Sequence, residues 1–259
     1  MTLEQILHDT MQEAQSIFEG KSHNISYYDI NMLPEEKREY YTDEGMDYRV
    51  KKFTNLRDEL LIIRCSSDKI YSDLISEKNS FLVGNCLLLT IFALQHLKKV
   101  YKQNLCQLFY PPDTDLSKLT CLLSLQLIVT DKPYNHAFAL ICPPSHIFPQ
   151  HKIKGKYEPN VFPEGSWVCD PWANIVCSAQ DYNHAWKARM AEWNTKGKVV
   201  FMGRTKTDYD NNFNYSPLGL YTYMAIQKSK KTIDEIIIIF PNGETKTKTN
   251  YSYPKCNLL

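Results

Sequence analysis

The stretch Gly84-Asn85-Cys86, followed by LLLTIFALQHLKKV over 87–100, decides the fold that the sequence predicts. Residues 87–97 are apolar on nearly all sides, which is typical of a helix that is buried all round. Asn85 is a favourable N-cap, and it places Cys86 in the first helical turn. A thiol there lies at the positive end of the helix dipole, where a thiolate is stabilised. A lone cysteine is more often a core residue, so Cys86 needs a charged partner to be a nucleophile.

The bulk composition limits the classes of protein to consider. The chain has 259 residues, 43% of them hydrophobic, which is enough for one large domain with a proper core. With 30 basic and 29 acidic residues its net charge is +1, so it lacks the excess positive charge that would indicate binding to nucleic acid or an anionic membrane. No apolar run is long enough to span a bilayer, and no secretory signal peptide is visible. Eight scattered cysteines favour reduced thiols in a reducing compartment over a disulfide framework.

Downstream of the central helix the chain has the pattern of strands joined by turns. Segment 121–130 becomes β-branched toward its end, and 136–142 is almost wholly apolar, which predicts a strand covered on both faces. The short turn at 131–133 makes these two strands antiparallel neighbours. Further elements are predicted as strands at 166–170, 199–201 and 233–240 and as a helix at 179–194.

Helical patterns precede the central helix. Segment 3–17 has apolar residues at helical spacing, and 56–74 is helix-like with an interruption at Ser66-Ser67, whereas 21–50 is predicted to be irregular with one short helix. Helices followed by an antiparallel sheet define an α+β fold. We expect one continuous domain, with 1–80 as its N-terminal helical part and 81–259 as a core with a sheet and a C-terminal extension.

Two residues on the predicted strands give Cys86 its partners. His136 opens the buried strand at 136–142, and Asp170 closes the strand at 166–170. In thiol chemistry an imidazole takes the thiol proton and a carboxylate fixes the tautomer and orientation of that imidazole. Trp172 could shield the imidazole–carboxylate hydrogen bond from water. Singly, each residue is more often structural, but the three types together predict a Cys86–His136–Asp170 catalytic triad.

The motifs GNC at 84–86, NHAFAL at 135–140 and WVCDPW at 167–172 resemble the papain-like superfamily of thiol proteases, transglutaminases and glutamine deamidases. The likeness is greatest to bacterial type III and type IV secreted effectors, including those of the Legionella type. It covers about two-fifths of the chain. It implies a papain-like or transglutaminase-like core, Cys86 as the nucleophile, His136 as general base and acid, and Asp170 as the orienting residue.

The resemblance also implies the reaction and its setting. It is attack on an amide carbonyl of a protein substrate, giving a thioester that water or an amine resolves, without a cofactor. The substrate is expected to be a host protein, and the enzyme is expected to reach the host cytosol through a secretion system without a cleavable signal peptide. A regulatory or inhibitory partner is left open.

The oxyanion-hole donors are not assigned by the resemblance. Papain has a glutamine shortly before its cysteine, whereas position 80 here is Ser80. Candidates are the backbone N–H of Cys86 and the side chains of Asn79, Ser80 and Asn85, and Trp172 is a further candidate for contact with the oxyanion or the substrate.

Three other interpretations remain open. Proteolysis, deamidation and transamidation share their first step, and the sequence does not separate them. An inert interaction module of the same fold could use the loop at 208–215 and the Lys/Thr/Asn-rich tail as a partner surface. A metal site is disfavoured, because its candidate ligands do not form two close-spaced pairs. These candidates are Cys142, His146, His151, Cys169 and Cys177.

Other residues are expected to have structural roles. His96 and His184 are expected to be solvated, Trp186 and Trp193 to be core residues, and 143–165 to be a surface excursion that either lines the substrate cleft or is decoration.

Overall fold

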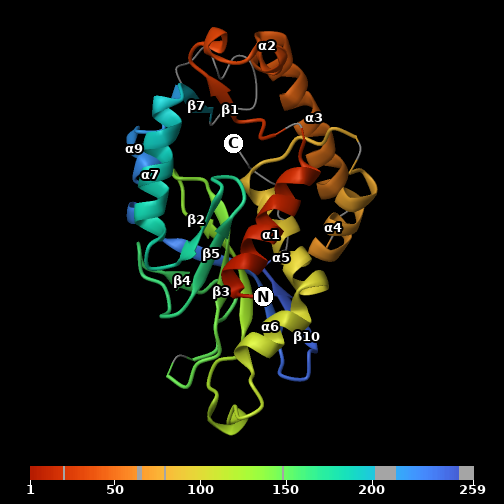
Figure 1. Ribbon diagram of the computed structural model, residues 1–259, viewed down its shortest axis with the longest axis vertical. Coiled ribbons are helices and arrows are strands. Elements are labelled where there is room, and N and C mark those ends of the chain that lie inside the picture. The colour runs from red at the N-terminus through yellow and green to blue at the C-terminus, as the bar shows by residue number, and fades with distance from the viewer. Residues whose placement is uncertain (20, 63–65, 79, 148, 202–213, 251–259) are drawn as a thin grey trace.

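Figure 1 shows the computed structural model of the protein, described here over residues 1–19, 21–62, 66–78, 80–147, 149–201 and 214–250. Its class is α+β, as predicted, with helices packed on an antiparallel sheet. The helices are α1 (Leu3–Ile17), α2 (Glu35–Arg38), α3 (Asp43–Ile62), α4 (Ser67–Ser76), α5 (Cys86–Val100), α6 (Lys102–Phe109), α7 (Tyr182–Thr195), α9 (Leu220–Tyr223) and α10 (Ala225–Lys228). Short 3-10 turns are η1 (Ile30–Met32), η2 (Glu39–Tyr41) and η3 (Leu116–Lys118).

Helix α5 lies at the centre. Asn85 has extended backbone, and its side-chain oxygen accepts the N–H of Leu88 at 2.9 Å, which confirms the predicted N-cap. Residues 88–95 are all buried, because α1 and α4 pack on one side of α5 and the sheet lies on the other. The prediction of a helix buried nearly all round is therefore confirmed over residues 88–95.

The main sheet is antiparallel, with strand order β10-β9-β2-β3-β5-β6 and β4 paired to β9. These strands are β2 (Ser124–Thr130), β3 (Ala137–Cys142), β4 (Lys156–Tyr157), β5 (Trp167–Asp170), β6 (Ile175–Ser178), β9 (Lys231–Ile239) and β10 (Thr245–Thr249). The predicted pairing of the two strands around the 131–133 turn is confirmed, and every residue of β3 is buried. Ala139 lies opposite Cys169, so the start of β3 and the end of β5 meet at the same end of the sheet.

The two faces of the sheet bury separate hydrophobic clusters. Helices α1, α4, α5 and α6 cover one face, where Leu127 and Ala139 point, and α7 and α10 cover the other, where Phe138 and Leu140 point. Period-2 alternation along β2 and β3 thus supplies both cores. The 143–165 segment is more than a surface excursion, because β4 pairs with β9 and Tyr157 packs against the second cluster.

A small antiparallel sheet of β1 (Ile25–Tyr27), β7 (Lys198–Phe201) and β8 (Asn214–Tyr215) joins the N-terminal part to the C-terminal half. Figure 1 shows β1 and β7 near α2 and α3 at one end of the molecule. The prediction of irregular chain over 21–50 is wrong in part, since this region holds β1, α2 and the start of α3. The expected tail also begins with a strand, β10. The 208–215 loop lies outside the described residues except for β8.

Candidate active site

The loop that precedes Cys86 is fixed by the chain segment that follows α1. The N–H of Gly84 donates to the carbonyl of Lys21 at 3.0 Å, and the carbonyl of Gly84 accepts the N–H of His23 at 3.1 Å. A Cβ at position 84 would lie 2.7 Å from the Phe18 ring, so only glycine allows this approach. The start of α5 is thereby held from outside the helix.

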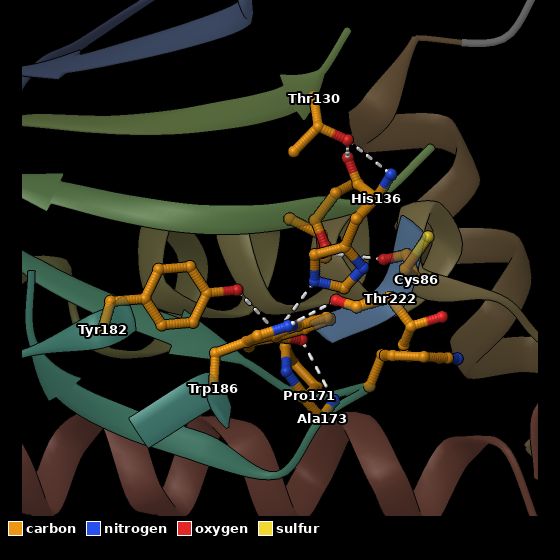
Figure 2. A network of polar contacts seen from close by, with 12 residues as sticks. Cys86, Thr130, His136, Pro171, Ala173, Tyr182, Trp186 and Thr222 are labelled. Carbon is orange, nitrogen blue, oxygen red and sulfur yellow. Dashed lines mark hydrogen bonds and ion pairs between the residues drawn. The ribbon is translucent and has the colours of Figure 1, made fainter. Parts of the chain in front are cut away.

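Cys86 is half-buried at the first turn of α5, where it packs against both hydrophobic clusters. Figure 2 shows Cys86 next to His136. Asn85 accepts the N–H of Leu88, and within the described residues the backbone N–H groups of Cys86 and Leu87 have no acceptor, because no helical turn precedes them. The first turn of the helix therefore offers two amide donors next to the sulfur.

His136 lies between the turn after β2 and the first residue of β3. Its N–H donates to Oγ1 of Thr130 at 2.7 Å, and its carbonyl accepts the N–H of Thr130 at 2.9 Å. Nε2 of the imidazole is 2.8 Å from Oδ2 of Asp170. Because a carboxylate only accepts, Nε2 carries the proton of this bond, and Nδ1 is left as the ring nitrogen that could take up a proton from Cys86.

The charge of Asp170 favours the imidazolium form of His136. Burial by itself lowers the pKa of His136, but the charge of Asp170 and its hydrogen bond outweigh burial. Together with the nearby side chain of Cys86, the charge and hydrogen bond of Asp170 raise the pKa of His136 to about 10. The site is therefore arranged to hold a proton on the imidazole at neutral pH, next to the sulfur that would have released it.

Asp170 is fully buried at the end of β5. Its Oδ2 also accepts the hydroxyl of Tyr182 at 2.8 Å, and its Oδ1 accepts the N–H of Ala173 at 3.1 Å. Together with His136 these donors satisfy both oxygens of the carboxylate. The orientation of the carboxylate, and through it that of the imidazole, is fixed by hydrogen bonds on three sides.

Two tryptophans exclude water from the imidazole. The rings of Trp172 and Trp186 lie 5.2 Å and 4.8 Å from the His136 ring, centroid to centroid, and both are buried. Each indole N–H has an acceptor, which is Oγ of Ser22 at 3.0 Å for Trp172 and the carbonyl of Thr222 at 2.8 Å for Trp186. Trp172 thus lies against the imidazole, in a position to shield its hydrogen bond with Asp170 from water.

The side chains predicted as oxyanion-hole donors differ in where they lie. Ser80 is exposed, and its hydroxyl donates to a carboxylate oxygen of Glu77 at 2.6 Å, so its proton is directed away from the site. Asn79 lies outside the described residues. Asn85 is half-buried beside Cys86, and because its Oδ1 caps α5, its side-chain N–H₂ is left as a donor.

Sequence reasoning missed Tyr182 and assigned Trp186 to the core alone. Both lie on α7, and their spacing of four residues places them on one helix face, which packs beside Asp170 and His136. Trp186 and Trp193 are core residues, as predicted.

The prediction that His96 is solvated is wrong: its Nδ1 lies 3.1 Å from the hydroxyl of Tyr71, and burial lowers its pKa. His184 is exposed.

The candidate metal ligands are dispersed by the fold. Cys142 packs in the cluster on one face of the sheet and Cys169 in the cluster on the other face. His151 lies 3.2 Å from the hydroxyl of Tyr157. In the described part of the chain no group of three or more His, Cys, Asp or Glu residues could hold a metal ion. No described helix is both long and apolar enough to cross a membrane.

Comparison with protein-family models, with curated proteins and with solved structures found no match. The fold and the geometry of the site are therefore the basis of the function proposed below.

The raised pKa of His136 gives the free energy of unfolding a defined pH dependence. A group whose pKa is higher in the folded state contributes stability that is complete below its unfolded pKa, near 6.5 for histidine, and is lost as the pH rises through the folded value of about 10. We expect the stability advantage of the wild type over His136→Gln to be smaller at about pH 10 than at about pH 6. Urea unfolding at both pH values measures it, and an advantage that grows with pH would show that the imidazole is held neutral.

Proposed function

We propose that this protein is a papain-like cysteine enzyme that attacks an amide bond of a protein substrate and forms a thioester at Cys86. One observation carries the proposal: His136 hydrogen-bonds a fully buried aspartate and lies next to a half-buried cysteine at a helix start. The placement of the three residues on α5, before β3 and at the end of β5 is the arrangement that the resemblance implies. A cysteine with only a structural role would not require an oriented imidazole beside it.

The chemistry follows from the positions of the protons. The Cys86 thiolate attacks the amide carbon, a C–S bond forms, and the carbonyl oxygen becomes an oxyanion beside the N–H groups of Cys86 and Leu87. The imidazolium of His136 gives its Nδ1 proton to the amide nitrogen, the C–N bond breaks, and the amine leaves. The neutral imidazole then takes a proton from water, the hydroxide attacks the thioester, and the C–S bond breaks to release an acid and the thiolate.

The same first step serves a glutamine deamidase or a transglutaminase, in which the attacked amide is a glutamine side chain and the leaving group is ammonia. Water completes deamidation and a lysine amine completes transamidation. We favour hydrolysis with peptidase-like chemistry. We also propose, from the resemblance, that the protein is a bacterial effector that acts on a host protein in the host cytosol, where thiols stay reduced.

Acylation by an activated ester tests the proposal without knowledge of the substrate. Incubation with p-nitrophenyl acetate should release p-nitrophenol and leave one acetyl group on Cys86, which peptide mapping by mass spectrometry locates. Absence of acetyl-Cys86, with labelling of other thiols instead, would support an inert interaction module. Intact-mass spectrometry of candidate host proteins then separates the outcomes: fragments mean proteolysis, a gain of about one dalton means deamidation, and cross-linked products mean transamidation.

The side chain of Asn85 is expected to serve both the helix and the reaction. Asn85→Ser keeps an oxygen that can cap α5 but removes the amide N–H₂ donor, so acylation of Cys86 should slow by about 10²-fold while the fold is retained. Asn85→Ala loses the cap as well and should cost about 1 kcal/mol of unfolding free energy. Stopped-flow release of p-nitrophenol measures the rates. Full activity of Asn85→Ser would leave oxyanion stabilisation to the amides of Cys86 and Leu87.

A further inference from the structure

A hollow of about 390 Å³ opens next to the loop that carries the candidate nucleophile. Its lining includes Glu39 and Tyr40 from η2, Glu44 and Tyr48 from the first two turns of α3, and Phe81 from the loop before α5. A volume of this size lies within the range of ligand pockets and holds one long side chain with room to spare. None of these residues is used by the mechanism described above.

The lining combines aromatic faces with negative charge. Tyr40 and Tyr48 are 44% and 51% exposed, and the Tyr40 ring stacks on Phe81 with centroids 5.6 Å apart. Glu39 and Glu44 are exposed, and in the described part of the chain neither carboxylate forms a recorded ion pair. Aromatic faces beside carboxylates attract a cation by charge and by cation–π contact, most strongly a planar guanidinium.

The floor of the hollow is connected to the active site. Arg49, which also lines the hollow, is buried and donates to the carbonyls of Ser22 and Tyr40. The hydroxyl of Ser22 in turn accepts the indole N–H of Trp172, whose ring lies against His136. The guanidinium of Arg49 is thus directed at backbone oxygens of the scaffold and at the ring of Tyr41. Nζ of Lys52 lies 5.8 Å from the centroid of the Tyr48 ring, and the negative charges of the lining are those of Glu39 and Glu44.

The length of the connecting chain limits how far the hollow can lie from Cys86. Phe81 and Cys86 are five residues apart, and a fully extended chain spans at most about 3.6 Å per residue, so their Cα atoms lie within about 18 Å. A substrate peptide with its amide at Cys86 would therefore reach the hollow with a side chain about five residues away or nearer.

We propose that this hollow, with the Glu39 and Glu44 carboxylates and the Tyr40 and Tyr48 rings, binds an arginine or lysine side chain of the protein substrate, within about five residues of the attacked amide. The inference rests on the proposed function, since it assigns the hollow to the substrate of that same site. It makes the substrate class a protein segment with a basic residue near the modified position.

Peptide binding to the inactive full-length variant Cys86→Ala tests this independently of catalysis. The probes are two fluorescein-labelled peptides of Gly and Ala with one central residue, which is arginine in one and the neutral isostere citrulline in the other. Fluorescence anisotropy should show about tenfold tighter binding of the arginine peptide. Glu39→Gln with Glu44→Gln should abolish this preference. The matched control, Glu35→Gln with Glu36→Gln, removes two carboxylates from α2 outside the lining and should leave it unchanged.

Equal binding of the two peptides, or a preference that survives the Glu39/Glu44 double change, would overturn the inference. A second arm uses wild-type protein and peptides that carry a chloromethyl ketone at the C-terminus, with arginine at increasing distance from it. The alkylation rate of Cys86 should be highest with arginine within about five residues of the ketone. Rates independent of arginine position would also overturn the inference. Failure of the proposed function is seen separately, as absence of acetyl-Cys86 with the ester.

Discussion

Cys86→Ala is expected to lower the rate of substrate turnover by at least about 10⁴-fold while the protein stays folded. The change removes the only atom that forms a covalent bond in the proposed reaction, so no other residue can replace its role. Because Cys86 is half-buried and the N-cap of α5 is on Asn85, the loss of unfolding free energy should be about 1 kcal/mol or less.

The chain offers a matched control for this variant. Cys106, on the neighbouring α6, is also a free and half-buried thiol, and burial raises its pKa. Cys106→Ala removes a sulfur of similar exposure and should leave activity unchanged. Turnover of the identified substrate and urea unfolding measure both variants. Full activity of Cys86→Ala would end the proposal.

Asp170→Asn is expected to lower turnover by about 10²- to 10⁴-fold and to leave a residual rate. The N–H of Ala173 needs the acceptor that Oδ1 of Asp170 provides, so the asparagine is expected to turn its oxygen to Ala173 and its N–H₂ group to Nε2 of His136. Because the N–H₂ group donates, Nε2 would become the acceptor and the imidazole would carry its proton on Nδ1. A neutral imidazole with its proton on Nδ1 has no lone pair on that nitrogen and cannot take the thiol proton. The variant therefore tests the orienting role without a change of volume.

Asp170→Ala should also destabilise the fold, by about 3 to 5 kcal/mol. It leaves three buried donors without their acceptor: the imidazole of His136, the hydroxyl of Tyr182 and the N–H of Ala173. Tyr182→Phe is the control, since it removes one hydrogen bond to the carboxylate and keeps the others. We expect that variant to lose less than about tenfold in rate and about 1 kcal/mol in stability. An Asp170→Asn rate equal to wild type would show that the carboxylate is structural.

The three candidate catalytic residues could be selected from the sequence because each lies at the end of an element with a strong local signal. Asn85 marks the start of a helix, His136 the start of an apolar strand, and Asp170 the end of another. Strands joined by a short turn pair as antiparallel neighbours, so the meeting of β2 and β3 was predictable. The adjacency of β3 and β5 required an additional assumption, which the register confirms.

What the sequence did not reveal depends on long-range packing. Charged residues fill most positions in the first half of α3, which obscures its apolar periodicity there, and β10 alternates threonine with lysine at an exposed edge and has no apolar signal. The bond from Tyr182 to Asp170 forms because α7 packs across the second face of the sheet. The backbone hydrogen bonds of Lys21 and His23 with Gly84 join two distant segments, since His23 and Gly84 are 61 residues apart in the sequence. No local pattern encodes such contacts.

The central claim is that the imidazole of His136, oriented by Asp170, makes Cys86 a nucleophile, and alkylation measured site by site tests it most directly. Iodoacetamide labelling, quantified by peptide mapping between about pH 5 and 9, compares Cys86 with Cys106, Cys142 and Cys177, whose pKa values burial raises. The account predicts rapid labelling of Cys86 well below pH 7 in the wild type, and labelling that requires a pH above about 8 in His136→Gln. Labelling of Cys86 no faster than that of Cys106, or unchanged by His136→Gln, would contradict it.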